Sequence, residues 1–367
     1  MSHELTSVQA LCALDRPYER TAEADALFVK AMQEIVGWHR RHCPVYAELL
    51  GSFDESALET PRDCASIPFV LANYFKAHEL MSIPRDQVTA HLTSSGTTGQ
   101  KSQMFFDEQT LGSAQRMLDL IYKTQGWWTD EPANYLLYTY ETEPDSQLGT
   151  AYTDNYMCKY APLKRGFLAL RRDGHGGHEF DLFGAIAALQ DYEREGLPVR
   201  VLGFPSFLWF TLKRMRDLKL PPLKLHPDSF LFVSGGWKGY ANQAVSKPEL
   251  VAACGELLGL APERVRDGYG SVEHCIPYID GPDHRLRIPV WSRAFARDPE
   301  TLAVLPEGEP GILHFVSPYI TSAPAHSLLT GDLARVWDDH FEVLGRAGTS
   351  RNKSCALAAS ELLRGKM

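Results

Sequence analysis

The sequence has few cysteines, and they are not paired at the spacing of a metal site. Seven occur in 367 residues, and no two form a C-x-x-C pair. An odd, scattered set argues against a disulfide framework or a structural zinc site and favours a reducing compartment. We therefore predict a cytoplasmic protein. The seven are Cys12, Cys43, Cys64, Cys158, Cys254, Cys275 and Cys355.

Long apolar runs and an excess of positive charge are also missing. No stretch stays apolar for the roughly 20 residues that a transmembrane helix needs. Residues 1–15 show no basic segment followed by an apolar run, the pattern of a secretory signal. A net charge of -9 argues against a protein that wraps nucleic acid or coats an anionic membrane. We predict a soluble protein with no membrane span and no nucleic-acid partner.

What the sequence does contain is an alternation of helical and strand-like patterns. Apolar residues at three- and four-residue spacing predict a helix over 24–41. Further helices are predicted over 108–122, 183–195, 206–218 and 248–258. Short apolar runs predict strands near 104–106, 199–205 and 229–233. From about residue 286 short strands and turns predominate. We predict an α/β fold of helix-flanked sheets with a small β-rich subdomain over about 286–345.

The most distinctive local feature is a loop rich in hydroxyl groups and glycine over residues 93–101. Its glycines let the backbone turn tightly and bring N–H groups close to an anion, while the hydroxyls add donors. Lys101 adds a positive charge for a phosphate. The loop is not that of P-loop nucleotidases, because Gln100 stands where their second glycine must be. The predicted phosphate-binding residues are Thr93, Ser94, Ser95, Gly96, Thr97, Thr98, Gly99 and Lys101.

Four further motifs follow this loop in a fixed order. They are Val233-Ser234-Gly235-Gly236, Tyr269-Gly270-Ser271-Val272-Glu273-His274, Thr330-Gly331-Asp332 and Gly345-Arg346. Together with the loop they resemble the adenylate-forming superfamily, which includes acyl-CoA ligases, luciferases and nonribosomal adenylation domains. One departure is Val272, which stands where threonine is usual. The resemblance runs from about residue 91 to residue 353.

This resemblance implies a fold, two cofactors and a set of roles. The fold would be the large N-terminal domain of those enzymes, and the cofactors would be ATP and Mg²⁺. Gly235, Gly236, Tyr269 and Gly270 would line the adenine site. Asp332 would accept hydrogen bonds from the ribose hydroxyls, and Arg346 would hold the ribose and neighbouring phosphate oxygens. Glu273 would contribute a carboxylate to Mg²⁺.

Several histidines allow both a catalytic and a structural interpretation. His274, beside the predicted metal ligand, would steer the substrate carboxylate, and His91 would contact phosphate. Each is also compatible with a role in the protein core. His175 and His178 lie among glycines and charged residues, a context more typical of a loop than of a metal site.

The end of the sequence departs from most of the superfamily. Only about twenty residues follow Arg346, whereas most relatives carry a further domain after this hinge. We predict an adenylation domain over 1–345 and a hinge remnant with a short tail over 346–367. This truncation resembles the acyl-protein synthetases of bacterial fatty-acid reductase complexes, the LuxE family. That resemblance implies that Cys355 in the tail accepts the acyl group, with Cys275 as the rival nucleophile.

The predicted reaction is ATP-dependent activation of a carboxylic acid as acyl-AMP, followed by acyl transfer to an enzyme cysteine. The resemblance implies a fatty acid, while an aromatic acid remains open. The downstream partner would be an acyl reductase or another acyl-accepting protein. Two alternatives remain: an acyl-CoA ligase of the phenylacetate type, and a catalytically idle relative that binds nucleotide.

Overall fold

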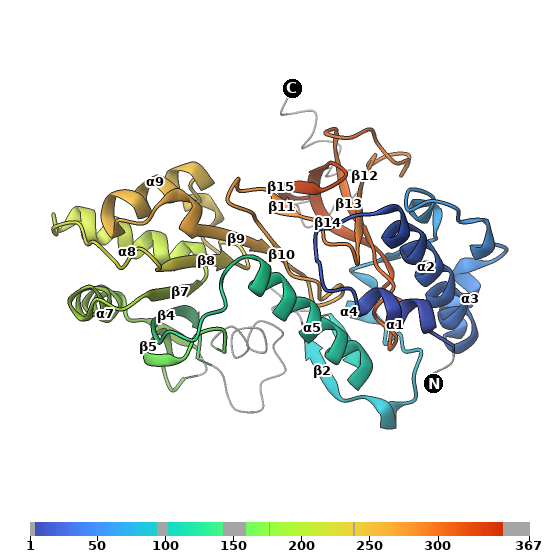
Figure 1. Ribbon diagram of the computed structural model, residues 1–367, viewed down its shortest axis with the longest axis horizontal. Helices are drawn as coiled ribbons and strands as arrows, with labels where there is room; N and C mark the ends of the chain where they lie inside the picture. The colour runs from blue at the N-terminus through green and yellow to red at the C-terminus, as the bar shows by residue number, and fades with distance from the viewer. Residues whose placement is uncertain (1–3, 94–101, 142–158, 176, 238, 348–367) are drawn as a thin grey trace. The chain divides into compact units, whose positions relative to one another are not determined.

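The computed structural model describes residues 4–93, 102–141, 159–175, 177–237 and 239–347 (Figure 1). The chain divides into two compact units. The first comprises the described parts of 1–124, 270–278 and 285–347, and the second comprises those of 125–269 and 279–284.

The second unit is built on a largely parallel sheet, seven-stranded over the described residues, in the order β10-β9-β8-β7-β4-β5-β6. Neighbouring strands from β9 to β5 are parallel, and β6 pairs antiparallel with β5. The strands are β4 (Ala133–Tyr140), β5 (Leu163–Arg172), β6 (His178–Phe180), β7 (Val199–Gly203), β8 (Phe230–Ser234), β9 (Val265–Tyr269) and β10 (Tyr278–Ile279). The carboxyl ends of β7, β8 and β9 therefore meet at one edge, where ligands bind in open α/β sheets.

Three helices connect these strands: α7 (Leu182–Glu195), α8 (Pro205–Asp217) and α9 (Lys247–Leu258). Local sequence signals set their limits. The side chains of Asp181 and Ser246 cap the starts of α7 and α9 by accepting backbone N–H bonds, and left-handed Gly196 and Gly259 end them. All three helices were predicted from the sequence, and each prediction is confirmed to within two residues.

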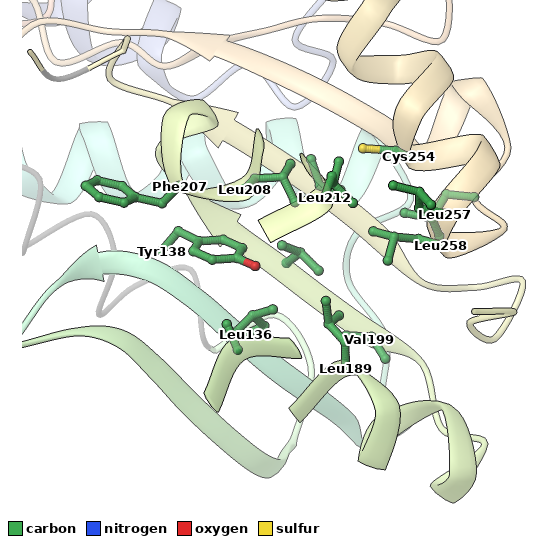
Figure 2. Packing of buried hydrophobic residues seen from close by; sticks show 14 of the residues in the cluster. Leu136, Tyr138, Leu189, Val199, Phe207, Leu208, Leu212, Cys254, Leu257 and Leu258 are labelled. Carbon is green, nitrogen blue, oxygen red and sulfur yellow. The ribbon is translucent and has the colours of Figure 1, made fainter. Parts of the chain in front are cut away.

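The core of this unit lies where the three helices cover one face of the sheet. Leu136 and Tyr138 of β4 and Val199 of β7 pack against Leu208 of α8 and Leu257 of α9 (Figure 2). All five residues are at most 3% exposed. Apolar burial of this kind contributes about 25 cal/mol per Å² of surface removed from water, so this packing is the main force holding the helices on the sheet.

The first unit contains a second sheet, six-stranded over the described residues. Its order is β11-β15-β14-β13-β12, and β1 pairs parallel with β14. The strands are β1 (Val70–Leu71), β11 (Leu286–Arg287), β12 (Arg293–Arg297), β13 (Pro310–Val316), β14 (Ser327–Val336) and β15 (His340–Arg346). The prediction that strands predominate from residue 286 is confirmed. A separate antiparallel pair, β2 (Ala90–Thr93) and β3 (Gln103–Phe106), flanks the predicted phosphate loop.

The helices of the first unit all lie in its N-terminal segment, residues 4–124. They are α1 (Thr6–Cys12), α2 (Ala22–His42), α3 (Pro44–Leu50), α4 (Tyr74–Ala77) and α5 (Glu108–Thr124). Helices α2 and α5 confirm the predictions for 24–41 and 108–122. Short 3₁₀ turns in the two units occupy Glu55–Ala57, Asp63–Ser66, Arg85–Gln87, Ala241–Gln243 and Pro262–Arg264.

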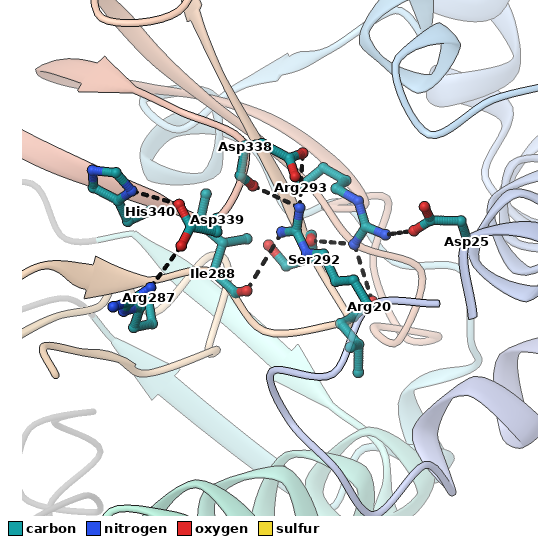
Figure 3. A network of polar contacts seen from close by, with 10 residues as sticks. Arg20, Asp25, Arg287, Ile288, Ser292, Arg293, Asp338, Asp339 and His340 are labelled. Atoms are coloured by element: carbon teal, nitrogen blue, oxygen red, sulfur yellow. Dashed lines mark hydrogen bonds and ion pairs between the residues drawn. The ribbon is translucent and has the colours of Figure 1, made fainter. Parts of the chain in front are cut away.

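A network of arginines and aspartates joins the N-terminal segment to the turn between β14 and β15 (Figure 3). Arg20 donates to both the side chain and the carbonyl of Asp338, at 2.9 and 2.6 Å. Arg293, which is 5% exposed, pairs with Asp25 of α2 and donates to the carbonyl of Ser292 at 2.7 Å. Burial lowers the pKa of Arg293 to about 10, so it stays charged at neutral pH. The network fixes the hairpin that carries Asp332 and Arg346.

Candidate functional site

Most of the predicted phosphate loop lies outside the described residues. This applies to Ser94, Ser95, Gly96, Thr97, Thr98, Gly99 and Lys101, and also to Cys355. Thr93 is described: it ends β2, is 8% exposed and faces Gln103 of β3 across the strand pair. The β2–β3 pair thus frames the loop, while the roles of the loop residues and of Cys355 stay predictions.

His91 is held within the same strand pair. Its ring stacks on that of Phe105 with centroids 4.5 Å apart, and its Nε2 forms a hydrogen bond with the side chain of Gln103. These contacts favour the structural interpretation of His91. The loop interpretation fits His175, because Asp173 accepts the backbone N–H bonds of His175 and Gly177. It is wrong for His178, which begins β6, pairs with Arg172 of β5 and forms a hydrogen bond from Nε2 to the carbonyl of Glu141 at 2.7 Å. Across the described ranges no cluster of three or more His, Cys, Asp or Glu residues is arranged to hold a metal ion.

Asp332 and Arg346, predicted from separate motifs, face each other across β14 and β15. Nε of Arg346 donates to Oδ1 of Asp332 at 3.2 Å. The register of the two strands shifts beside this pair, and Gly345 adopts a φ of 140°, which only glycine accommodates easily. The side chain of Arg346 is 73% exposed and that of Asp332 is 14% exposed. The pair therefore presents an acceptor and an oriented guanidinium to a ligand.

Glu273 lies in a tight turn that directly follows β9. The carbonyl of Ser271 accepts N–H bonds from His274 at 3.2 Å and from Cys275 at 2.8 Å, and Cys275 has a φ of 55°. Glu273 itself is 6% exposed. Mg²⁺ is usually bound through one or two carboxylates together with water and substrate phosphates. A single buried carboxylate fits that donor set.

His274 is a buried residue of the first unit. It is 1% exposed, its Nε2 is 2.6 Å from the hydroxyl of Tyr278, and its ring stacks on Phe315. The hydroxyl of Tyr319 donates to its carbonyl at 2.6 Å. Burial lowers the pKa of His274 to about 3, so the ring is neutral at physiological pH. These contacts favour a role in shaping the Glu273 turn, and the predicted catalytic role stays a prediction.

Cys275 is a poor candidate for the acyl-accepting nucleophile. Its thiol donates to the carbonyl of Val272 at 3.1 Å. Burial of the thiol raises the pKa of Cys275 to about 12, and the negative charge of Glu273 adds to this effect, although the residue as a whole keeps intermediate exposure. The thiolate is the reactive form of cysteine, and almost none forms at pH 7 with such a pKa.

Three of the remaining predicted nucleotide residues, Gly235, Gly236 and Tyr269, belong to the second unit. Gly235 and Gly236 follow β8 with φ values of 76° and 69°, so the backbone makes a left-handed turn that favours glycine. Tyr269 ends the neighbouring strand β9. Gly270 begins the segment assigned to the first unit. The glycine turn and Tyr269 thus come from adjacent strands at the carboxyl edge of the sheet.

A pocket of about 220 Å³ opens beside the end of β8 and the first three residues of β9. It is smaller than the roughly 300–1,000 Å³ typical of drug-sized ligands, so it suits a single ring system or one part of a larger ligand. Its walls are mainly apolar, and Asp267 supplies an acceptor. The lining residues are Pro205, Val233, Trp237, Val245, Lys247, Leu250, Val251, Val265, Arg266 and Asp267.

Sequence reasoning missed three polar residues near this pocket: Asp267, Lys247 and Asp280. A signal existed for the first, because Asp267 lies two residues before Tyr269 and therefore on the same face of β9. Nothing in the sequence marks Lys247 or Asp280, since their association depends on how α9 packs beside the strand.

Comparison with known proteins identifies the family. A family model described as acyl-protein synthetase, LuxE, matches residues 2–364. The chain belongs to this family. The predicted class, a ligase that activates a carboxylic acid and transfers the acyl group to protein, is therefore confirmed. Two relatives of this LuxE chain are named long-chain-fatty-acid–luciferin-component ligase. The Vibrio harveyi protein is 26% identical over 84% of this chain and 81% of its own length, and the Aliivibrio fischeri protein is 22% identical over 81% and 79%.

Solved structures confirm the predicted fold class. An open conformation of 2-hydroxyisobutyryl-CoA ligase, in complex with 2-HIB-AMP and CoA, aligns with a TM-score of 0.63 and 16% identity. The alignment covers 92% of the LuxE chain and 79% of the ligase. The same ligase in its postadenylation state gives a TM-score of 0.64 over 92% and 71%. At this level of identity the similarity concerns the fold alone. None of the helices in the described ranges has the length and hydropathy needed to cross a membrane.

Proposed function

We propose that this LuxE chain activates a long-chain fatty acid with ATP and Mg²⁺ and transfers the acyl group to Cys355. The two relatives named above support the substrate class, because both names specify a long-chain fatty acid. We further propose a cytoplasmic location and delivery of the acyl group to an acyl reductase or another acceptor protein.

The observation that carries this proposal is the pairing of Asp332 with Arg346. A carboxylate beside an arginine suits a ribose phosphate, because the carboxylate accepts from hydroxyl groups and the guanidinium donates to phosphate oxygens. Asp332 has a second function in the pair, since it holds the long side chain of Arg346 in place. Ordering the arginine before the ligand arrives reduces the entropy lost on binding.

The pocket of the second unit would take the adenine base. Its apolar walls match the faces of a flat heterocycle, and Asp267 offers an acceptor for an amino group. The left-handed turn at Gly235 and Gly236 leaves the backbone without side chains at that point, so a ring can approach closely.

The chemistry takes two steps. In the first, a carboxylate oxygen of the acid attacks the α-phosphorus of ATP, forming acyl-AMP and releasing pyrophosphate. Mg²⁺ bound through Glu273 would neutralise charge on the phosphates, and the loop with Lys101 would bind the departing pyrophosphate. In the second, the thiolate of Cys355 attacks the acyl carbon, a thioester forms, and AMP leaves with the electron pair of the broken C–O bond.

ATP–pyrophosphate exchange tests the first step. The purified protein is incubated with labelled pyrophosphate, ATP, Mg²⁺ and a series of acids that includes fatty acids of increasing length and aromatic acids. We expect exchange that depends on the acid and is fastest with a long-chain fatty acid. Exchange only with aromatic acids, together with consumption of coenzyme A, would favour the phenylacetate-type ligase. Tight ATP binding without exchange for any acid would contradict the proposed activity.

A further inference from the structure

A cluster of charged side chains, of which only that of Asp280 is fully buried, lies beside the pocket of the second unit. Nζ of Lys247, at the start of α9, forms an ion pair with Oδ2 of Asp280 and lies 3.9 Å from Oδ2 of Asp267. The side chain of Asp280 has no exposed surface, whereas those of Lys247 and Asp267 are 29% and 43% exposed. Lys247 and Asp267 both line the pocket. The lysine therefore bridges a buried anchor and a carboxylate that a ligand can reach.

Asp280 is held firmly enough to act as that anchor. Its Oδ1 accepts the backbone N–H of Asp267 at 2.9 Å, and its own N–H donates to the carbonyl of Asp267 at 3.1 Å. Its carbonyl accepts from Nη1 of Arg266 at 2.7 Å, and Nδ1 of His284 lies 3.4 Å from its Oδ2. A buried carboxylate with this many partners has a fixed position, and so does the ammonium group bound to it.

The charge of Asp267 depends on these neighbours. Desolvation by the pocket wall raises the pKa of Asp267 to about 6, although part of the side chain stays open to the pocket. Lys247 opposes this effect, the negative charge of Asp280 adds to it, and the N–H of Gly268 favours the ionised form by donating to Oδ1 at 2.8 Å. Arg266, on the same strand, also lines the pocket, and its guanidinium donates to the carbonyls of Glu263 and Asp280. Lys247 is thus the cation that keeps Asp267 ionised near neutral pH.

We propose that Lys247, held by Asp280, is a positioning residue for ATP binding: it keeps Asp267 ionised and oriented to accept a hydrogen bond from the amino group of the base. This inference rests on the proposed function, because it takes the pocket as the base site. It adds a specific determinant of nucleotide affinity that does not touch the reacting atoms. Its consequence is that affinity for ATP depends on pH through Asp267 and that Lys247 sets the midpoint of that dependence.

The test is the dissociation constant of Mg-ATP measured from pH 5.5 to 8.5 by calorimetry. Asp267→Asn provides the baseline, because its amide oxygen still accepts a hydrogen bond but does not titrate. Any pH dependence left in that variant comes from the phosphates and from other groups. Lys247→Gln removes the cation, and Lys247→Arg restores it. Because Lys247→Gln leaves Asp280 buried without its ion-pair partner, the double variant Lys247→Gln, Asp280→Asn serves as the better-folded form.

We expect wild-type affinity, corrected by the Asp267→Asn baseline, to fall as the pH drops through about 6. In Lys247→Gln the midpoint should move up by about one pH unit, the usual effect of a neighbouring charge. In the double variant it should move less, because Asp280→Asn also removes a negative charge that raises the pKa of Asp267. Lys247→Arg should return the midpoint to that of the wild type. An unchanged midpoint in Lys247→Gln, in protein that is folded and binds Mg-ATP, would overturn the inference.

Failure of the proposed function gives a different result. Wild-type protein that binds ATP with the expected pH dependence but makes no acyl-AMP would refute the activity and leave the role of Lys247 supported. Protein that binds no ATP at any pH would refute both.

Discussion

Nε of Arg346 donates a hydrogen bond to Oδ1 of Asp332 at 3.2 Å, from facing positions on β15 and β14. The two residues are 14 positions apart in the sequence and were assigned to different motifs. Their pairing makes them one unit in which the largely buried carboxylate orients the exposed guanidinium. The affinity for a ligand that contacts either group should therefore fall when the other group is removed.

Substituting either member of this pair should weaken ATP binding. Hydrogen bonds to charged groups contribute about 1.5–3 kcal/mol, so Arg346→Ala and Asp332→Asn should each raise the KM for ATP by about 10- to 100-fold. Because the residues act together, the double variant should lose less than the product of the two single effects. Steady-state kinetics of acyl-AMP formation measures this, with exposed Glu342→Gln on the same strand as the control. A KM unchanged in Arg346→Ala would remove the pair from the nucleotide site.

Glu273→Gln should change how activity depends on Mg²⁺. The substitution keeps the shape of the side chain but removes the charge that favours a hard divalent cation. We expect the rate of acyl-AMP formation to fall by about 100-fold at 1 mM Mg²⁺ and to recover partly at higher concentrations. Glu263→Gln, at an exposed 3₁₀ turn, is the matched control and should behave like the wild type. The same Mg²⁺ dependence in Glu273→Gln and wild type would contradict the assignment.

Substitution by alanine at two glycine positions should change the stability of the protein in opposite directions. Gly203, at the end of β7, has a φ of 127°, and a Cβ there would come within 2.3 Å of the carbonyl oxygen of Tyr138. Gly203→Ala should therefore destabilise the protein by about 2 kcal/mol or more. Gly112, inside α5, has open space around it, so Gly112→Ala should stabilise by about 0.5–1 kcal/mol. Urea denaturation measures both, and a stable Gly203→Ala variant would refute this account of the strand end.

Stability should decrease in mild acid because of buried neutral histidines. Burial lowers the pKa of His274 and of His326 to about 3, from 6.5. Between pH 6.5 and about 3 the unfolded chain binds protons that the folded chain does not, so the free energy of unfolding falls as the pH falls. Each histidine should contribute a loss of about 1 kcal/mol between pH 7 and 5.5.

The check is to measure the free energy of unfolding at both pH values in the wild type, His326→Gln and the surface variant His226→Gln. Replacing His326 should remove its part of the pH dependence, even though the variant also loses the hydrogen bond from Tyr46 to Nε2 of His326 at 2.7 Å. His226, a partly exposed loop residue, serves as the control for the loss of a histidine outside the core. Equal pH dependence in wild type and His326→Gln would contradict the assignment of a neutral buried ring.

The sequence predicted elements where a local pattern was strong. Helices α7, α8 and α9 have clear apolar spacing, and α7 and α9 also have capping residues, so their positions follow from local interactions. Strands β4 and β5 were missed. Strand β4 reads as an aromatic run with little alternation, because six of its eight residues are buried, so both faces of the strand are covered. Such strands are defined by partners far away in the sequence.

The same distinction holds for the site. Motif order placed Asp332, Arg346 and Glu273 in one family pattern, and the structure brings the first two together. The motif order could not show that His274 is a core residue stacked on Phe315, because that contact depends on a strand about 40 residues away in the sequence. Nor could it reveal the ion pair between Lys247 and Asp280, which lie on separate segments of the second unit.

The most direct test of the central claim is the intact mass of the protein after incubation with ATP, Mg²⁺ and a long-chain fatty acid. Wild type and the variants Cys355→Ser and Cys275→Ser are compared, and pyrophosphate is measured in the same samples. We expect one hydroxylamine-sensitive acyl group on the wild type and on Cys275→Ser, none on Cys355→Ser, and pyrophosphate in all three. An acyl group that persists on Cys355→Ser, or wild-type protein that forms neither adduct nor pyrophosphate, would contradict the proposed mechanism.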